Sequence, residues 1–186
     1  MPRLWLLLLL LTGAGACTLG SVPAPPPAPE VDGGVPAPWL RPCWLPGVRR
    51  QAFCGNYEVF EDRAARRGRR IPLAVAYLPA RSTTPAPDPV FFLDGGPGNA
   101  ATEAAAEIVE LLGPVLEDRP LVLVDQRGTG GSNPLSCDFG KVAAEPELFA
   151  LAQVRTCREK LSRQADLTLY TTPIAMADLD EVRAAL

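Results

Sequence analysis

The 186 residues are enough for one domain, and 47% apolar with 21% charged residues is a globular composition that excludes disorder throughout the chain. The formal net charge of −3 excludes the overall basic character of a nucleic-acid-binding protein. We therefore expect a folded domain without a nucleic-acid partner.

The first sixteen residues have the pattern of a secretory signal peptide. Arg3 supplies a positive charge, residues 4–11 form a short apolar stretch, and residues 14–16 form a small-residue cleavage site. The apolar stretch is too short to span a membrane. Cys17 follows the cleavage site and also fits the lipidated cysteine of a bacterial lipoprotein. We expect export, with the mature protein either secreted or lipid-anchored through Cys17 at the bacterial cell envelope.

Residues 17–42 are assigned to a linker, because residues 22–42 are dense in proline with two glycines in the middle. Such a composition favours extended conformations that do not form a packed core. Fully extended at roughly 3.1 Å per residue, it would span about 60 Å as a tether. An arm without a role is the alternative. The folded domain is predicted over residues 43–186.

Two strands are predicted at residues 56–60 and 71–78, joined by an arginine-rich turn. The cluster in this turn has no interleaved aromatic residues, so a solvated hairpin tip is expected, with an anion site as the alternative. Its members are Arg63, Arg66, Arg67, Arg69 and Arg70.

Two apolar strands at residues 90–93 and 121–124 flank a helix predicted over residues 100–112. This order predicts a βαβ unit with a parallel strand pair, in a sheet covered by helices on both faces.

Two further helices are predicted, at about residues 145–163 and at 174–186. Thr172 is expected to be the N-cap of the last helix and Pro173 its first helical residue.

Four cysteines remain outside the signal region, and an even number in an exported chain predicts disulfides. They are Cys43, Cys54, Cys137 and Cys157. Three pairings are possible, of which Cys43 with Cys54 and Cys137 with Cys157 close the shortest loops. The chain has no histidine and no C-x-x-C motif, which argues against a zinc site. We expect neither a metal nor a cofactor.

The turn at residues 95–98, Gly-Gly-Pro-Gly, contains residues suited to presenting the backbone to a ligand. One interpretation is a dinucleotide fingerprint, since residues 96–101 match G-x-G-x-x-A and Asp125 ends the next strand. Against it, two strands precede the turn, and an exported protein rarely meets NAD. Asp125 also lies 29 residues after Gly96, where about twenty is usual.

A second interpretation of this turn is an oxyanion hole. In α/β-hydrolases, the loop after the third strand directs a backbone N–H at the developing oxyanion. Counted from residue 56, the strand at residues 90–93 is the third. The remaining interpretation is a tight structural turn that binds nothing.

Two motifs, DGGPG at residues 94–98 and DQRGTGGSNP at 125–134, together resemble the exported branch of the proline iminopeptidase and tripeptidyl aminopeptidase family. These S33-type serine peptidases have the α/β-hydrolase fold. The resemblance extends from about Cys43 to Leu186. It includes EDR at 61–63, PLSC at 134–137 and the final YTTPIAMADLDEVRAAL.

The resemblance implies that backbone N–H groups around Gly95 and Gly96 supply half of an oxyanion hole. Many relatives have histidine at the first motif position, where this chain has Asp94. Because the backbone supplies the donors, this departure changes little, but a carboxylate beside an oxyanion is unfavourable unless it points away. Asp125 and Arg127 are interpreted as a loop-fixing ion pair, with direct substrate contact as the alternative.

The catalytic residues of such a peptidase are not found in this sequence. A hydrolase nucleophile lies in G-x-S-x-G and is followed by an acid and a histidine. The chain has no G-x-S-x-G and no histidine, and Ser132 in GGSNP is interpreted as a turn residue. In the family, the segment resembling residues 177–186 is the helix before the nucleophile strand.

The predicted fold class is therefore α/β: the N-terminal half of an α/β-hydrolase, with strands 1–4 and helices A–B of a mostly parallel sheet, truncated before the nucleophile elbow. The strand at residues 90–93 would then be an exposed edge, and the 186-residue product alone is expected to be prone to aggregation.

The predicted function is that of the N-terminal part of an exported serine exopeptidase. Such an enzyme would release residues or short peptides from peptide N-termini, and the chain as given is expected to be inactive. The peptide substrate is the expected partner. The alternatives are a non-catalytic exported lipoprotein or interaction module and, more weakly supported, a dinucleotide-binding enzyme.

Overall fold

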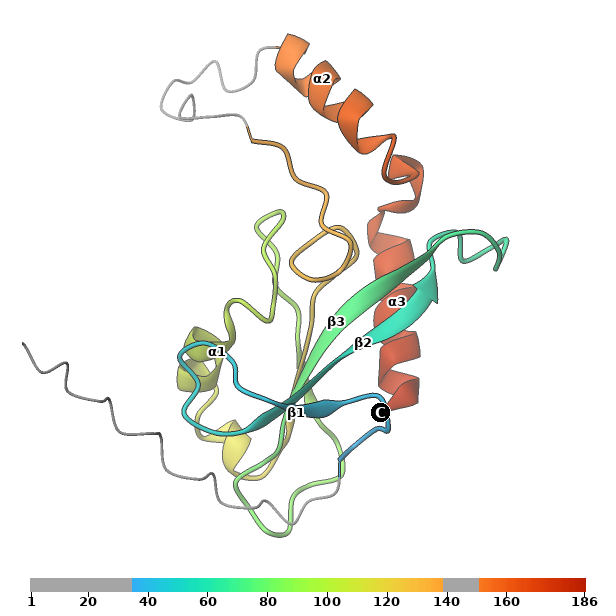
Figure 1. The fold of residues 1–186 in the computed structure, drawn as a ribbon. Coiled ribbons are helices and arrows are strands. Elements are labelled where there is room, and N and C mark those ends of the chain that lie inside the picture. Colours follow the sequence, from blue (N-terminus) through green and yellow to red (C-terminus); the bar gives the residue numbers. More distant parts are fainter. Residues whose placement is uncertain (1–34, 139–150) are drawn as a thin grey trace, which may run out of the picture.

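The computed structural model describes residues 35–138 and 151–186, which form a mixed five-stranded sheet with a helix packed on each face and a further helix that extends beyond it (Figure 1). The signal peptide, Cys17 and most of the linker lie outside the described residues. The strands are β1 (Arg41–Cys43), β2 (Ala52–Phe60), β3 (Arg70–Leu78), β4 (Val90–Phe92) and β5 (Leu121–Val124). The helices are α1 (Ala105–Leu111), α2 (Leu151–Leu161) and α3 (Thr172–Ala185), with 3-10 turns at Val115–Glu117 and Leu167–Leu169.

The strand order in the sheet is β1-β2-β3-β5-β4. The predicted parallel pair is confirmed, since β4 runs parallel to β5, with Val90 opposite Leu121. The other three neighbouring pairs are antiparallel, so the described sheet is mixed and not mostly parallel. The short links from β1 to β2 and from β2 to β3 favour antiparallel neighbours, whereas a parallel pair needs a longer crossover such as the one through α1.

Several element boundaries differ from the predictions. β2 begins at Ala52, four residues earlier than predicted, and the three-residue β1 was not predicted at all. α1 begins at Ala105 and not at residue 100, because the preceding residues form turns that enter the helix. α2 occupies the predicted region as far as it is described.

The N-cap of α3 is Thr171, so the prediction of Thr172 was wrong by one residue. Pro173 lies in the first turn, as expected, where its missing N–H costs no helical hydrogen bond.

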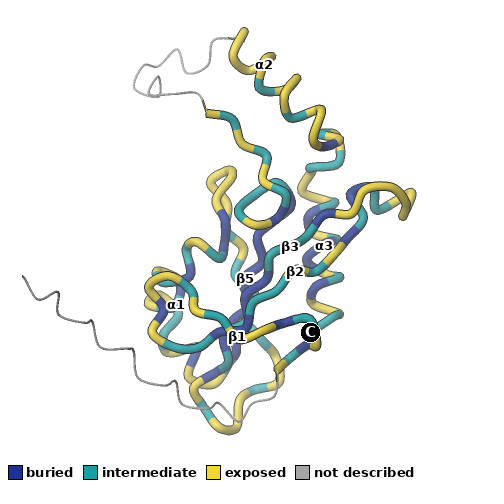
Figure 2. The backbone as a smooth tube through the Cα atoms, viewed as in Figure 1, coloured by how far each residue is buried: buried dark blue, intermediate teal, exposed yellow. Residues whose placement is uncertain are grey.

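Helices cover both faces of the sheet, as the all-apolar strand β5 predicted. Side chains alternate along a strand, so Leu121 and Leu123 lie in the cluster on the α1 side, while Val122 and Val124 lie on the α3 side. All four are buried (Figure 2). The α1 side contributes Ala105 and Ile108. Leu179 and Val182 of α3 pack on the other face.

The end of the proline-rich stretch packs against the domain. Ala37 and Leu40 are buried beside Phe53 of β2. The folded part therefore includes residues before the predicted boundary at Cys43.

Both of the shortest-loop disulfide pairings occur in the structure. Cys43 pairs with Cys54 at a Cα–Cα distance of 5.7 Å, and Cys137 pairs with Cys157 at 5.9 Å. Across the described residues, we find no helix with the length and apolar character needed to cross a membrane.

Candidate functional site

The two sequence motifs form neighbouring loops at one edge of the sheet. The glycine turn, residues 94–98, follows β4, and the second loop, residues 125–134, follows β5. Because β4 and β5 are parallel, their carboxyl ends meet at the same edge, where open α/β sheets bind ligands. The side-chain amide of Gln126 donates a hydrogen bond to the carbonyl oxygen of Asp94 at 2.8 Å. The second motif therefore fixes the start of the first.

The glycine turn has an open, exposed backbone. Gly96 and Gly98 have φ values of 141° and 96°, which disfavour other residues. A Cβ added at Gly95 or Gly98 would meet no atom within 4 Å. The space beside Gly95 and Gly98 is therefore free for a ligand to approach the main chain, whereas the Asn99 side chain lies against Gly96.

The two N–H groups predicted to act as oxyanion donors differ in their hydrogen bonding. Gly95 N–H donates to Asp94 Oδ1 at 2.7 Å, so this carboxylate lies against the turn backbone. An aspartate beside a turn commonly accepts from a nearby backbone N–H that has no secondary-structure partner. Within residues 35–138 and 151–186, Gly96 N–H has no hydrogen-bond acceptor.

Asp125 links the second loop to the segment that enters α1. Its carboxylate accepts hydrogen bonds from Thr102 N–H, the Thr102 hydroxyl and Gly131 N–H, each at 2.9 Å. The residue is 1% exposed. Gly130 packs directly against it, with φ of 46°, and an added Cβ would overlap the Asp125 carboxylate and the Ala100 side chain.

Arg127 is paired with Asp178 of α3, so the predicted ion pair with Asp125 is not formed. Arg127 Nε and Nη2 donate to the two carboxylate oxygens of Asp178 at 2.6 and 2.9 Å, and both side chains are almost fully buried. Arg127 Nη1 donates to the carbonyl oxygens of Glu61 and Leu169, each at 2.9 Å. The bidentate geometry fits a planar guanidinium on a carboxylate. Asp125 and Arg127 therefore each bind other segments of the chain and do not form an ion pair with each other.

A second set of polar side chains near Arg127 connects the start of the arginine-rich turn to the second loop, residues 125–134. Tyr170 donates its hydroxyl hydrogen to Glu61 Oε1 at 3.0 Å and accepts from the Asn133 side-chain amide at 2.5 Å. Burial raises the pKa of Tyr170 to about 12, and the hydrogen bond to Glu61 adds to this. The Arg127 guanidinium lies 5.6 Å from the centre of the Tyr170 ring.

Two arginines of the arginine-rich turn have carboxylate partners. Arg63 forms ion pairs with Asp178 and Glu181, and Arg69 Nε lies 3.5 Å from Glu61 Oε2. Arg66 and Arg67 are exposed, as expected for a solvated hairpin tip.

Ser132 is a structural turn residue, as predicted. It is fully buried, donates to Asp125 O at 2.7 Å and accepts from Ala74 N–H at 2.8 Å. These bonds use its hydroxyl group to join the loop to β3.

Sequence reasoning missed Gln126, Thr102 and Asp178 as members of this region. Gln126 stands between two residues that were singled out. Asp178 carried a signal, because it is a carboxylate on the same helical face as the apolar Ala175 and Val182. A charged residue at such a position is buried only with a partner.

Comparison of the chain with models of known protein families gave no match, and a search among curated proteins found no significant similarity. These comparisons therefore identify no family for the chain.

Proposed function

We propose that the chain forms the oxyanion-hole part of an exported α/β-hydrolase, a serine exopeptidase that acts on peptide N-termini. The observation that carries this proposal is the glycine turn at the end of β4. Counted from β2, β4 is the third strand, and its glycine turn lies in the connection between β4 and α1. This is where α/β-hydrolases have the loop that donates an N–H to the oxyanion.

The geometry of the turn suits this chemistry. An oxyanion hole needs preorganised N–H donors that face a space where charge develops. Gln126 holds Asp94 at the start of the turn, Asp125 holds Thr102 a few residues after it, and residues 95–99 between them are exposed. In this proposal Gly96 N–H is the available donor, and Gly95 N–H becomes available when Asp94 turns aside.

The dinucleotide alternative is less well supported by this geometry. A fingerprint glycine loop leads directly into a helix whose N-terminus binds the pyrophosphate. Here residues 99–104 separate the turn from α1, and Asp125 is engaged with Thr102 and Gly131.

The proposal requires a nucleophile, acid and base that these 186 residues do not supply, because the sequence has no G-x-S-x-G and no histidine. The first test is to read the coding DNA beyond the Leu186 codon in all three frames. A frame with G-x-S-x-G and a later histidine supports the proposal. A stop codon followed by unrelated sequence contradicts it and favours a non-catalytic binding protein.

The second test is activity of the whole gene product on fluorogenic di- and tripeptides, with free or acetylated N-termini. A serine exopeptidase should react with a fluorophosphonate probe and cleave only the free peptides. Asp94→Ala should raise kcat several-fold, because it frees the Gly95 donor, whereas Asp88→Ala on an exposed loop should leave it unchanged. Equal cleavage of blocked and free peptides would contradict the exopeptidase assignment.

A further inference from the structure

The two disulfides have different structural surroundings. Cys43–Cys54 joins β1 to β2, which are also joined by sheet pairing, with Cys54 opposite Arg41. Both cysteines pack against the buried cluster on the α1 side of the sheet. If this bridge were opened, the strand pairing and the core would still hold the two cysteines close together.

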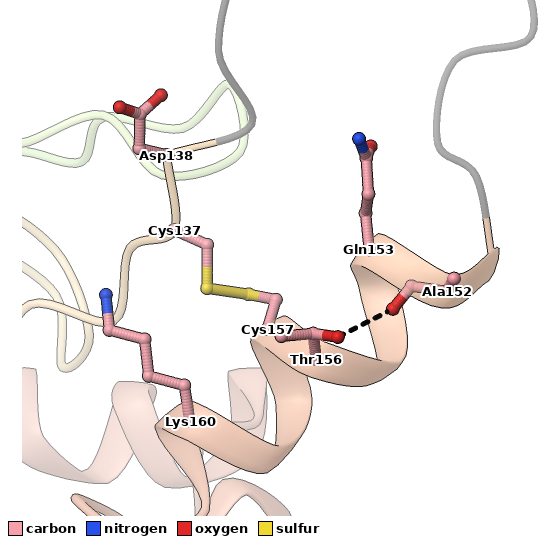
Figure 3. Close-up of a pocket in the computed structure, with 7 residues that line it drawn as sticks. All are labelled: Cys137, Asp138, Ala152, Gln153, Thr156, Cys157 and Lys160. Carbon is pink, nitrogen blue, oxygen red and sulfur yellow. Dashed lines mark hydrogen bonds between the residues drawn. A yellow bond between two sulfur atoms is a disulfide. The ribbon is translucent and has the colours of Figure 1, made fainter.

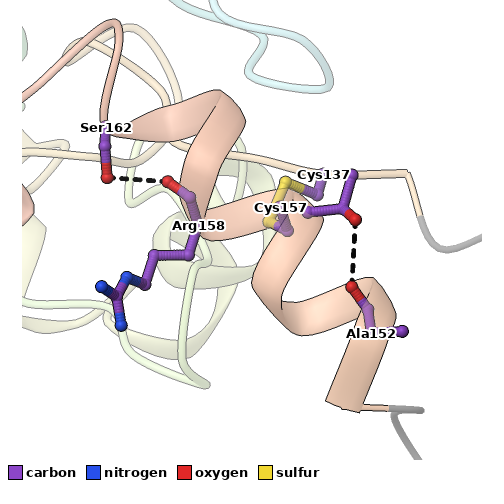
Figure 4. Close-up of a disulfide and its surroundings, with 6 residues drawn as sticks. Cys137, Ala152, Cys157, Arg158 and Ser162 are labelled. Carbon is purple, nitrogen blue, oxygen red and sulfur yellow. Dashed lines mark hydrogen bonds between the residues drawn. A yellow bond between two sulfur atoms is a disulfide. The ribbon is translucent and has the colours of Figure 1, made fainter.

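Cys137–Cys157 joins the loop after β5 to α2, and α2 has little other support. No residue of α2 is buried, and Leu151 is 72% exposed. The side-chain hydrogen bonds of Thr156 and Ser162 go to carbonyl groups of α2 itself (Figure 4). In the part of the chain that the structure describes, no hydrogen bond or ion pair joins α2 to another helix or strand.

Small molecules can reach the Cys137–Cys157 bridge. Both cysteines line an open pocket of about 390 Å³, shown in Figure 3. Lys160, three residues after Cys157 on α2, lines the same pocket. A positive charge near a cysteine stabilises its thiolate and makes that sulfur the better leaving group.

We propose that Cys137–Cys157 is a thiol–disulfide exchange site for small dithiols, and that Cys43–Cys54 remains oxidised when this bridge opens. Reduction would release α2 from the loop after β5 and leave the sheet intact. The inference does not depend on hydrolase activity.

The exchange proceeds in two balanced steps. A thiolate of the dithiol attacks Cys137 Sγ, the disulfide bond breaks, and its electron pair leaves with Cys157 Sγ. The second thiolate of the dithiol then attacks the dithiol sulfur that is bound to Cys137, and Cys137 leaves as a thiolate. Two electrons pass from the dithiol, which becomes a disulfide, and both protein thiolates take protons from water.

The test is a titration of the exported protein, purified under oxidising conditions, with dithiothreitol. Free thiols are alkylated at each concentration, and the modified cysteines are identified by peptide mass spectrometry. Cys137 and Cys157 should be half-reduced at a dithiothreitol concentration at least about tenfold below that for the other pair. Joint reduction of the two pairs, or earlier reduction of Cys43–Cys54, would overturn the proposal. The measurement separates the pairs even in associated protein.

Two variant comparisons test the parts of the mechanism. Lys160→Gln should slow reduction of Cys137–Cys157 severalfold relative to Arg155→Gln, which removes a charge from the same helix outside the pocket. Equal rates would remove Lys160 from the mechanism. Trypsin should cut α2 severalfold faster in the double variant Cys137→Ser, Cys157→Ser than in the oxidised protein. An unchanged cleavage rate would show that the bridge does not hold α2.

Discussion

The two loops at the carboxyl edge of the sheet differ in how firmly they are held. In the loop after β5, Asp125, Arg127 and Ser132 are each 5% exposed or less, and the side chain of each makes at least two hydrogen bonds, including one to a residue outside the loop. The glycine turn after β4 is exposed, and within residues 35–138 and 151–186 one hydrogen bond, from Gln126, joins it to another loop. The comparison shows that a buried loop can position an adjacent open one, which keeps the backbone of the open turn accessible.

The largest effect should come from breaking the buried ion pair behind the second loop. Arg127→Met leaves the Asp178 carboxylate buried with only Arg63, and we expect a loss of about 3–5 kcal/mol in the free energy of unfolding. Urea denaturation measures it. The control Arg183→Met breaks an exposed pair with Asp180 and should cost less than about 1 kcal/mol. Similar losses for the two variants would contradict the assigned role of the pair.

The next largest effect is expected from replacing Asp125, which follows β5, and it is compared with replacing Asp94, which follows β4. Asp125→Asn replaces an acceptor of three hydrogen bonds by a group whose NH₂ faces other donors, and should cost about 2–3 kcal/mol. Asp94→Asn alters one exposed local bond and should cost about 0.5 kcal/mol. Thermal and urea unfolding of both variants test this. If Asp94→Asn were the more damaging change, the glycine turn would be the more firmly held loop.

A smaller effect is expected from adding a methyl group to a glycine in each loop. Gly130→Ala places its methyl against Asp125 and Ala100 at a positive φ, and should cost about 1–3 kcal/mol. Gly95→Ala enters open space and should change stability by less than about 0.5 kcal/mol. Comparison of the two urea midpoints distinguishes a packed loop from an open one. Equal shifts would mean that the space beside Gly95 is not free.

The smallest effect is a pH dependence at the tyrosine behind the second loop. The pKa of Tyr170 is raised to about 12, against about 10 in the unfolded chain. Its contribution to stability is therefore full below pH 10 and is lost as the pH rises toward 12, because the unfolded chain ionises first. The free energy of unfolding measured from pH 9 to 11.5 should fall less steeply in Tyr170→Phe. Parallel slopes for the two proteins would contradict this assignment.

Much of the fold could be predicted from local patterns. The apolar run of β5 predicted a strand buried on both faces, and the strand–helix–strand order predicted its parallel pairing with β4. β1 was missed because three residues that include a proline give almost no periodic signal. The start of α1 was misplaced because alanines at 100 and 101 favour a helix, yet they are buried in turns that lead into it.

The candidate site was predictable as two motifs but not as a set of contacts. The glycine pattern indicated an open turn, and Asp125 and Arg127 were identified as loop residues. Their partners could not be predicted, because Thr102 and Asp178 are brought near them only when α1 and α3 pack on opposite faces of the sheet. The orientation of Asp94 depended on its own backbone, which composition does not determine.

The hydrogen bond from Gly95 N–H to Asp94 makes ligand binding at this donor a competition. The resident carboxylate is one residue away, so its effective concentration at the N–H is far above that of any free acceptor. A neutral oxygen with a single hydrogen bond should lose this competition. A ligand displaces Asp94 only if it engages several donors together or carries negative charge. The turn therefore favours negatively charged oxygens that accept several hydrogen bonds over neutral carbonyl oxygens that accept one.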